Sequence, residues 1–172
     1  MEMWDILNAD GVPTGKTTPR GKCSLKAGEY HLVVHIWVVS PRGEFLIQRR
    51  SDTKKLMPGE WAATGGAAIS GEDSYTAANR ELYEELGVAS NKQTLKKLTR
   101  IKRRNSLLDL WFVNTYIKES RLKLQEDEVA EARWVSRDEF KNMIKNGEFH
   151  NYGKEYFDTL FQKIDEQIGV TV

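Results

Sequence analysis

The chain has 172 residues, and its 26 lysines and arginines nearly balance its 25 aspartates and glutamates to leave a net charge of +1. Such a balance gives no overall field that would favour nucleic acid or a membrane surface as a partner. The single cysteine, Cys23, excludes a disulfide framework and a cysteine-based zinc site. The length suits one domain with its own core, and we expect residues 1–172 to form a single domain.

The N-terminal residues lack the basic start and apolar run of a secretory signal. No apolar stretch approaches the ~20 residues that a membrane span needs. We therefore expect a cytoplasmic protein with no membrane partner.

The first part of the chain predicts strands and turns. A short strand is expected at residues 4–7, and turns at 10–11 and at 13–15, where proline and glycine cluster. Residues 30–39 are dense in β-branched and aromatic side chains, which is typical of a central strand. A turn and a returning strand at 44–49 complete a hairpin, and an irregular stretch around residue 61 follows.

Residues 73–86 form the strongest predicted helix. Asp73 is a good N-cap, and Gly87 is the residue favoured just beyond a helix C-terminus. One apolar stripe runs along the helix at spacings of three or four, formed by Tyr75, Ala78, Leu82 and Leu86. We expect this stripe to pack against a sheet.

The second half predicts three strands, at 94–103, 107–117 and 129–135. Ser136, with Glu139 three residues later, predicts a capped helix, and a last helix is expected at 154–168. Strands around one central helix, with helices at the end of the chain, predict an α/β fold with a mixed sheet in an α/β/α sandwich.

Three carboxylates share one face of the predicted helix. Glu81, Glu84 and Glu85 stand at i, i+3 and i+4, where like charges repel one another unless a cation lies between them. Hard oxygen ligands select magnesium or manganese rather than a soft metal, and magnesium commonly bridges carboxylates and substrate phosphates. The pattern predicts a magnesium site, although a solvated helix face is the ordinary reading of three such residues alone.

Residues 66–88, GAAISGEDSYTAANRELYEELGV, resemble the Nudix box, a glycine-glutamate-arginine pattern that ends in Arg-Glu-x-x-Glu-Glu. All its fixed positions match: Gly66, Glu72, Arg80, Glu81, Leu82, Glu84, Glu85, Gly87 and Val88. The resemblance implies a Nudix fold and a magnesium-dependent hydrolase (manganese is possible) that cleaves a diphosphate linkage.

The resemblance also implies roles for the box residues. Glu81, Glu84 and Glu85, with the backbone at Gly66, would bind the metal, and Glu84, Glu85 and Arg80 would belong to the catalytic centre. Glu72 and Arg80 would pair and brace the loop against the helix, because the arginine fork holds a carboxylate at two points.

Outside the box, the resemblance implies a further catalytic glutamate ahead of the Trp134-Val135-Ser136 segment. Glu128 is the candidate, and an acidic turn facing solvent is the alternative. Arg49 and Arg50 close the predicted hairpin near the expected cleft, so one of them would contact substrate phosphate, unless both merely solvate a strand end.

Basic residues gather in and around the strand predicted at 94–103. They could form a surface that binds polyanions, but we prefer the alternative that they are the solvated face of an edge strand. A nucleic acid partner is therefore unlikely. The members of this basic run are Lys92, Lys96, Lys97, Arg100, Lys102, Arg103 and Arg104.

The N-terminal half resembles a branch of the Nudix superfamily that is similar to isopentenyl-diphosphate isomerase. Isomerases carry a catalytic cysteine followed by Gly-His in the loop before the helix, whereas this chain has Thr64-Gly65-Gly66-Ala67. His31 matches a histidine that isomerases use as a metal ligand, but we expect it, like His35, to be a strand residue without that role.

Hydrolysis is therefore the preferred function, and an isomerase or a non-catalytic nucleotide-binding Nudix module is the alternative. The expected substrate is a nucleoside di- or triphosphate or another nucleoside diphosphate derivative. A homodimer is possible, since dimers are common in the family.

Overall fold

The structure is a computed structural model that describes residues 2–21 and 25–169. Cys23 lies outside the described residues. Within the described ranges no helix is both long enough and apolar enough to span a membrane.

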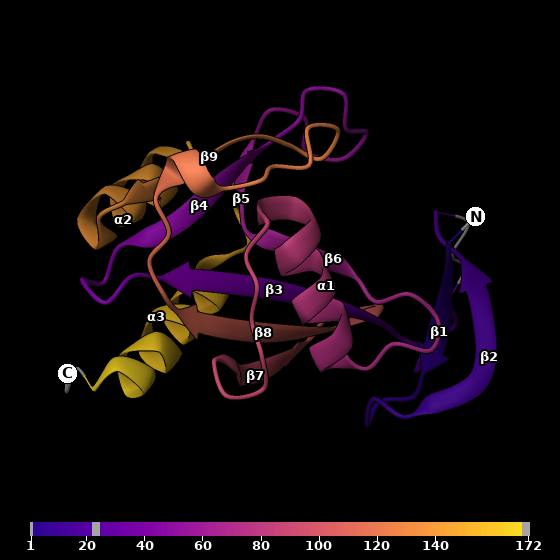
Figure 1. The fold of residues 1–172 in the computed structure, drawn as a ribbon. Coiled ribbons are helices and arrows are strands. Elements are labelled where there is room, and N and C mark those ends of the chain that lie inside the picture. The colour runs from indigo at the N-terminus through magenta and orange to yellow at the C-terminus, as the bar shows by residue number, and fades with distance from the viewer. Residues whose placement is uncertain (1, 22–24, 170–172) are drawn as a thin grey trace.

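A seven-stranded mixed sheet forms the centre of the molecule (Figure 1). Its main path runs in the order β5 (Trp61–Ala62), β4 (Phe45–Arg50), β3 (His31–Val39), β8 (Ser106–Asn114) and β7 (Leu95–Lys102). Two further strands lie off this path, β6 (Thr64–Ala67) on β3 and β9 (Val129–Val135) on β4. Strands β3 and β8 are parallel and the other pairs are antiparallel, so the predicted mixed sheet is confirmed.

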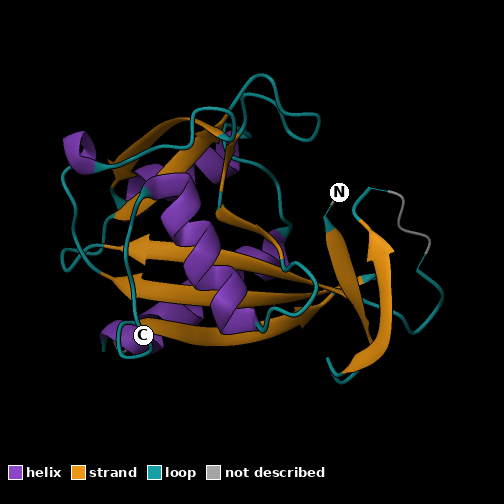
Figure 2. Ribbon diagram, turned by 45° about the vertical axis from the view of Figure 1, so that its right-hand side comes forward, coloured by secondary structure: helices purple, strands orange, loops and turns teal. Residues whose placement is uncertain are grey.

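Helices cover both faces of this sheet (Figure 2). Helix α1 (Ser74–Leu86) crosses one face, while α2 (Arg137–Asn146) and α3 (Lys154–Ile168) pack with the core of the other. A short 3₁₀ helix, η1 (Glu119–Arg121), precedes β9. The predicted α/β/α sandwich is therefore confirmed.

The two cores follow the alternation of side chains along the central strands. On β3, Val34 and Ile36 face α1, whereas Trp37 and Val39 face α3. Every residue of β8 except Asn114 is buried, because helices cover it from both sides. This explains why the sequence of β8 shows no single apolar face.

Helix α1 begins and ends where the sequence predicts. The Asp73 carboxylate accepts a hydrogen bond from the Thr76 amide at 2.7 Å, which satisfies one of the free N–H groups at the helix start. Gly87 adopts a left-handed conformation with φ of 68° and donates to the Tyr83 carbonyl, which ends the helix. Both caps fix the position of the glutamate-bearing turns.

The turn predicted at 13–15 is wrong, because these residues lie in a strand. β1 (Met3–Leu7) and β2 (Pro13–Pro19) form a separate two-stranded sheet, in which residues 14–16 bulge opposite Ile6. Gly15, at φ of 79°, supplies the positive φ of the bulge, and Pro13 starts the strand, where no amide is needed. Proline and glycine suit such a bulge as well as a turn.

The irregular stretch predicted around residue 61 is also wrong in part, since β5 and β6 lie there. Both strands are short, and β6 contains Gly65 and Gly66, so neither has the alternating apolar pattern that predicts a strand. Strand β8 ends at Asn114, three residues before the predicted end at 117.

Candidate metal and catalytic site

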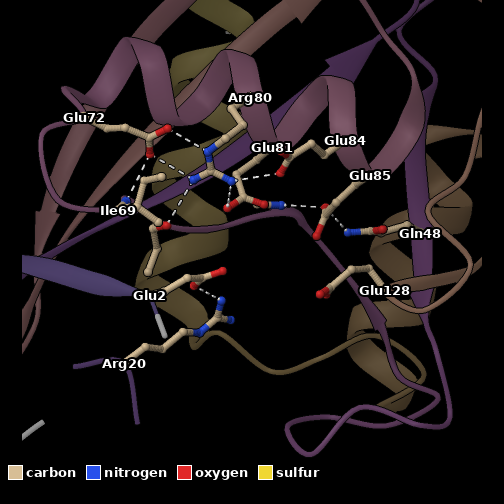
Figure 3. A network of polar contacts seen from close by, with 12 residues as sticks. Glu2, Arg20, Gln48, Ile69, Glu72, Arg80, Glu81, Glu84, Glu85 and Glu128 are labelled. Carbon is tan, nitrogen blue, oxygen red and sulfur yellow. Dashed lines mark hydrogen bonds and ion pairs between the residues drawn. The ribbon is translucent and has the colours of Figure 1, made fainter. Parts of the chain in front are cut away.

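The acidic face of α1 lines a cleft of about 540 Å³. Glu81, Glu84 and Glu85 form one wall, and Gly65 and Gly66 of β6 lie beside them. The β1–β2 hairpin contributes Glu2 and Arg20, whose side chains lie across the cleft from α1 and pair at 2.6 Å (Figure 3). Residues far apart in the sequence thus meet around the three glutamates.

Arg80 is the hub of the polar network on α1 (Figure 3). Its Nε and Nη2 donate to the two carboxylate oxygens of Glu72 at 2.7 and 2.9 Å, and Nη2 also reaches the carbonyl of Ala67 at 3.3 Å. Nη1 donates to Glu81 Oε1 at 2.9 Å and to Glu84 Oε2 at 3.0 Å. The structure therefore brings Glu72 and Arg80 together and ties the loop before α1 to its acidic face.

Glu85 is the most deeply buried of the three glutamates, with 3% of its surface exposed. Its Oε2 accepts hydrogen bonds from Gln48 Nε2 at 2.7 Å and from the Gly65 amide at 3.0 Å. Burial raises the pKa of Glu85 to about 8, and the charge of Glu81 adds to this rise. A carboxylate in this position is stabilised by a nearby cation.

Glu81 fills the space that a side chain at position 66 would need. A Cβ on Gly66 would lie 2.5 Å from Glu81 Oε1, so a side chain at this position would displace the Glu81 carboxylate. Burial raises the pKa of Glu81, although the Arg80 guanidinium opposes the rise. The carboxylates of Glu81 and Glu85 thus lie in an environment that disfavours their negative charge.

The donor set fits a hard divalent cation. Within residues 2–21 and 25–169, no three acidic, histidine or cysteine side chains converge as a ready-made metal site. Arg80 holds one oxygen each of Glu81 and Glu84, and Gln48 holds one of Glu85. The second oxygen of each carboxylate accepts no hydrogen bond from the described residues, so three oxygens remain to bind a cation such as magnesium.

Glu128 lies on the same cleft, in the loop before β9, and faces Glu85 (Figure 3). Its Oε1 pairs with Lys54 Nζ at 2.5 Å, and its backbone carbonyl accepts from the Ser51 amide at 2.9 Å. These two contacts join the loop after β4 to the loop before β9.

The structure separates the two arginines at the end of β4. Arg50 lines the cleft, and its Nε donates to the Leu56 carbonyl at 3.0 Å. Arg49 points elsewhere and pairs with Asp52 at 3.3 Å and Glu131 at 3.7 Å. Only Arg50 is therefore placed to meet a substrate in the cleft.

The two strand histidines occupy different surroundings. His31 stacks on Trp4 with ring centroids 4.2 Å apart, and burial lowers its pKa to about 4. His35 Nδ1 hydrogen-bonds the Tyr156 hydroxyl at 2.8 Å, and burial lowers the pKa of His35 to about 3. Both line the cleft as neutral side chains.

The sequence pattern gives no cleft role to several residues that shape the cleft, among them Gln48, Arg103, His150 and Tyr152. Gln48 is fully buried in β4, and the other three line the cleft from the β7–β8 connection and the segment before α3. No local motif marks these positions, because each reaches the cleft only through long-range packing. Arg103 was instead grouped with the basic run of an edge strand.

Comparison with known proteins identifies the family. The sequence matches the NUDIX domain over residues 29–157. This chain belongs to the Nudix family. A protein of Listeria monocytogenes named as an uncharacterized Nudix hydrolase is 38% identical over 153 residues, which cover 88% of this chain and 90% of that protein. Family membership supports a hydrolase that acts on a pyrophosphate bond.

Two other similarities agree with this assignment. The isopentenyl-diphosphate Delta-isomerase of Halorhodospira halophila is 34% identical over 100 residues, which cover 58% of this chain and 57% of that enzyme. The crystal structure of DR0079 from Deinococcus radiodurans has a TM-score of 0.71 at 22% identity and covers 86% of this chain and 91% of that one. The first is a partial similarity to an enzyme that shares the domain, and the second supports the fold.

Proposed function

We propose that this Nudix protein is a magnesium-dependent hydrolase of a nucleoside di- or triphosphate, or of another nucleoside diphosphate derivative. The observation that carries the proposal is the set of three carboxylates on one face of α1, each with a free oxygen, in a cleft that also contains arginine side chains. Negative groups at one wall suit a cation, and the arginines suit phosphate oxygens.

Glu81, Glu84 and Glu85, with the backbone at Gly66, would hold the magnesium ion, and manganese could replace it. The bound cation would neutralise phosphate oxygens and lower the barrier to attack by water. Arg80 would keep Glu81 and Glu84 in place, and its pair with Glu72 would keep the loop against the helix.

The reaction needs a proton acceptor, and Glu128 is the candidate. Water oxygen forms a bond to one phosphorus, the bond from that phosphorus to the bridging oxygen breaks, and the bridging oxygen leaves with the electron pair. The proton of the attacking water passes to Glu128, whose Oε2 is free of the contact with Lys54. Arg50, which also lines the cleft, would bind an oxygen of the substrate phosphates.

Isomerisation of an isoprenoid diphosphate is the second candidate, because the chain is partly similar to such an isomerase. The segment from Thr64 to Ala67, beside the glutamates, contains neither cysteine nor histidine. Hydrolysis is therefore the function that this cleft supports better.

The first test is a magnesium-dependent turnover screen of wild type and Glu85→Gln over nucleoside di- and triphosphates, nucleotide sugars and isopentenyl diphosphate. We expect wild type to release a monophosphate product from a nucleotide. We expect Glu85→Gln to lose at least ~100-fold in kcat, as is typical when a metal or base group is removed. Glu128→Gln should lose activity by a similar factor if Glu128 accepts the proton.

Glu155→Gln is the matched control, because Glu155 is an exposed glutamate on α3 that does not line the cleft. Equal activity of Glu85→Gln and Glu155→Gln would contradict the proposed metal site. Isomerisation without hydrolysis would favour the second candidate, and nucleotide binding with no turnover would favour a non-catalytic module.

A further inference from the structure

The cleft has a basic end formed by Arg103, which lies in the connection between β7 and β8. The Arg103 amide donates to the Ser106 carbonyl at 2.8 Å, and the carbonyl of Asn105 accepts from the His31 amide at 3.2 Å. These bonds fix the connection to the end of β3, so the Arg103 side chain extends into the cleft from a rigid base. Ser106, which is buried, lines the cleft beside it.

Arg103 differs from the other three arginines of the cleft because its guanidinium has no polar partner among the described residues. Arg20 pairs with Glu2, Arg80 pairs with three glutamates, and Arg50 donates to a backbone carbonyl. In the described part of the chain, the Arg103 guanidinium forms neither an ion pair nor a hydrogen bond, although the residue is half-buried. A partly desolvated cation without a partner favours an anion beside it.

The polar groups around Arg103 do not neutralise it. Its charge contributes to the low pKa of His35, after burial, and this histidine is therefore neutral. Burial raises the pKa of Tyr152 to about 12, so this hydroxyl is also uncharged; Arg50 and Arg103 lower this pKa, and Glu85 raises it. Tyr152 lines the same cleft as Arg103 and the α1 glutamates.

The backbone that carries the Arg103 end of the cleft lies well away from the strand beside the α1 glutamates. Gly66 lies opposite Val34 on one side of β3, and Ser106 lies opposite His31 on the other side. With ~3.3 Å per residue along a strand and ~4.8 Å between strands, these positions are roughly 14 Å apart. Arg103 is anchored on the β7 side of Ser106, so its backbone lies farther still from Gly66, and an anion at this end would belong to another part of the substrate than the linkage held at α1.

We propose that Arg103, assisted by Ser106, forms a subsite for a second phosphate group on the nucleoside part of the substrate. The inference rests on the proposed function for the reaction. It narrows the proposed substrates to nucleoside diphosphate derivatives that carry an additional phosphomonoester on the sugar. The planar guanidinium binds two oxygens of a phosphate at once, and the serine hydroxyl supplies a further donor.

The test compares matched substrates that differ only in this phosphate. They are adenosine 5′-diphosphate and its derivatives phosphorylated at the 2′ or the 3′ oxygen, with wild type, Arg103→Met and Arg104→Met. We expect wild type to favour one phosphorylated member by about 10-fold or more in kcat/KM, as charged hydrogen bonds provide. Arg103→Met should abolish this preference, whereas Arg104→Met, a change of the exposed neighbouring arginine, should retain the wild-type ratio.

A binding measurement separates this proposal from the proposed function. Calorimetry without metal compares adenosine 5′-monophosphate with adenosine 2′,5′- and 3′,5′-bisphosphate, none of which contains a diphosphate linkage. Tighter binding of one bisphosphate by wild type and Arg104→Met, but not by Arg103→Met, supports the subsite even if no substrate is hydrolysed. Equal affinities in wild type, or the same loss in both variants, would overturn it whether or not hydrolysis occurs.

Discussion

The carboxylate of Glu85 lies against the amide of Gln48, a side chain with no contact with solvent. Gln48 Nε2 also reaches the Ala63 carbonyl at 3.3 Å, so its two donor hydrogens are used, while its Oε1 is buried without a partner among the described residues. The amide therefore presents its donor side to Glu85. Gln48 is a positioning residue that holds one candidate ligand from behind.

Replacement of Gln48 by methionine tests this role, since methionine has a similar size and no donor. Partners that orient metal ligands are typically worth 10- to 100-fold in metal affinity or activity. We expect Gln48→Met to require roughly 10-fold more magnesium for half-maximal turnover and to have a lower kcat. Titration of magnesium against initial rate measures both quantities.

Gln162→Met is the control for this change. Gln162 makes the same type of amide-to-carboxylate bond, to Glu166 at 3.1 Å, on the exposed side of α3. It should leave the magnesium requirement unchanged. An unchanged magnesium requirement in Gln48→Met would show that Gln48 does not position a metal ligand.

At the scale of elements, the site depends on close contact between α1 and β6. Gly65 allows this contact because its φ of 143° is open only to glycine and its amide donates to Glu85. A Cβ at this position would lie 2.0 Å from the Val34 carbonyl oxygen on β3, a backbone atom with no freedom to move aside. The helix, the short strand and the central strand thus meet at one glycine.

Gly65→Ala should therefore disrupt the pairing of β6 with β3 and displace the Gly65 amide from Glu85. We expect a loss of more than about 2 kcal/mol in the free energy of unfolding, because a steric clash adds to the backbone strain. Urea denaturation measures this loss. Gly43→Ala is the matched control, since Gly43 also has a positive φ, of 81°, but has open space around it.

The control should lose only the cost of the left-handed backbone, about 1–2 kcal/mol. If both variants lose the same free energy of unfolding, the clash of a Cβ at position 65 with the Val34 carbonyl oxygen adds nothing to the cost of the positive φ.

At this scale, some features of the site can be predicted from the sequence and others cannot. Glu81, Glu84, Glu85 and the caps of α1 are predictable, because helical spacing and end signals are local. Arg103 is not, since its place in the cleft depends on how β8 pairs with β3, far away in the sequence. The β1–β2 bulge shows a second limit, because proline and glycine signal a break in regular structure without specifying a turn.

At the scale of the whole molecule, the cleft is lined both by the β1–β2 hairpin and by the C-terminal part of the chain. Helix α3 packs on the face of β3 opposite α1. The Tyr156 hydroxyl is hydrogen-bonded to His35 Nδ1 at 2.8 Å and accepts a hydrogen bond from the indole nitrogen of Trp37 at 3.1 Å. The segment just before α3 places Tyr152 and His150 at the cleft. The core between β3 and α3 therefore supports the substrate side of the site.

This core contains a buried neutral histidine, so the stability of the whole chain should depend on pH. Burial lowers the pKa of His35 from its ordinary 6.5 to about 3. Between these values the unfolded chain binds a proton at His35 that the folded chain does not, so the contribution of His35 to the free energy of unfolding falls as pH decreases below 6.5. One such proton contributes about 1.4 kcal/mol per pH unit, or about 2 kcal/mol by pH 5.

Urea denaturation of wild type and His35→Gln at about pH 7.5, 6 and 5 measures this contribution. We expect the difference in free energy of unfolding between wild type and His35→Gln to shrink as pH decreases, with the two curves converging. His31, whose pKa burial lowers to about 4, and Glu85, whose pKa burial raises to about 8, contribute with opposite signs to both curves, so the difference between the curves reports His35. Parallel curves would mean that His35 takes up its proton in the folded chain as readily as in the unfolded one, and that the packing of α3 on β3 does not exclude water from it.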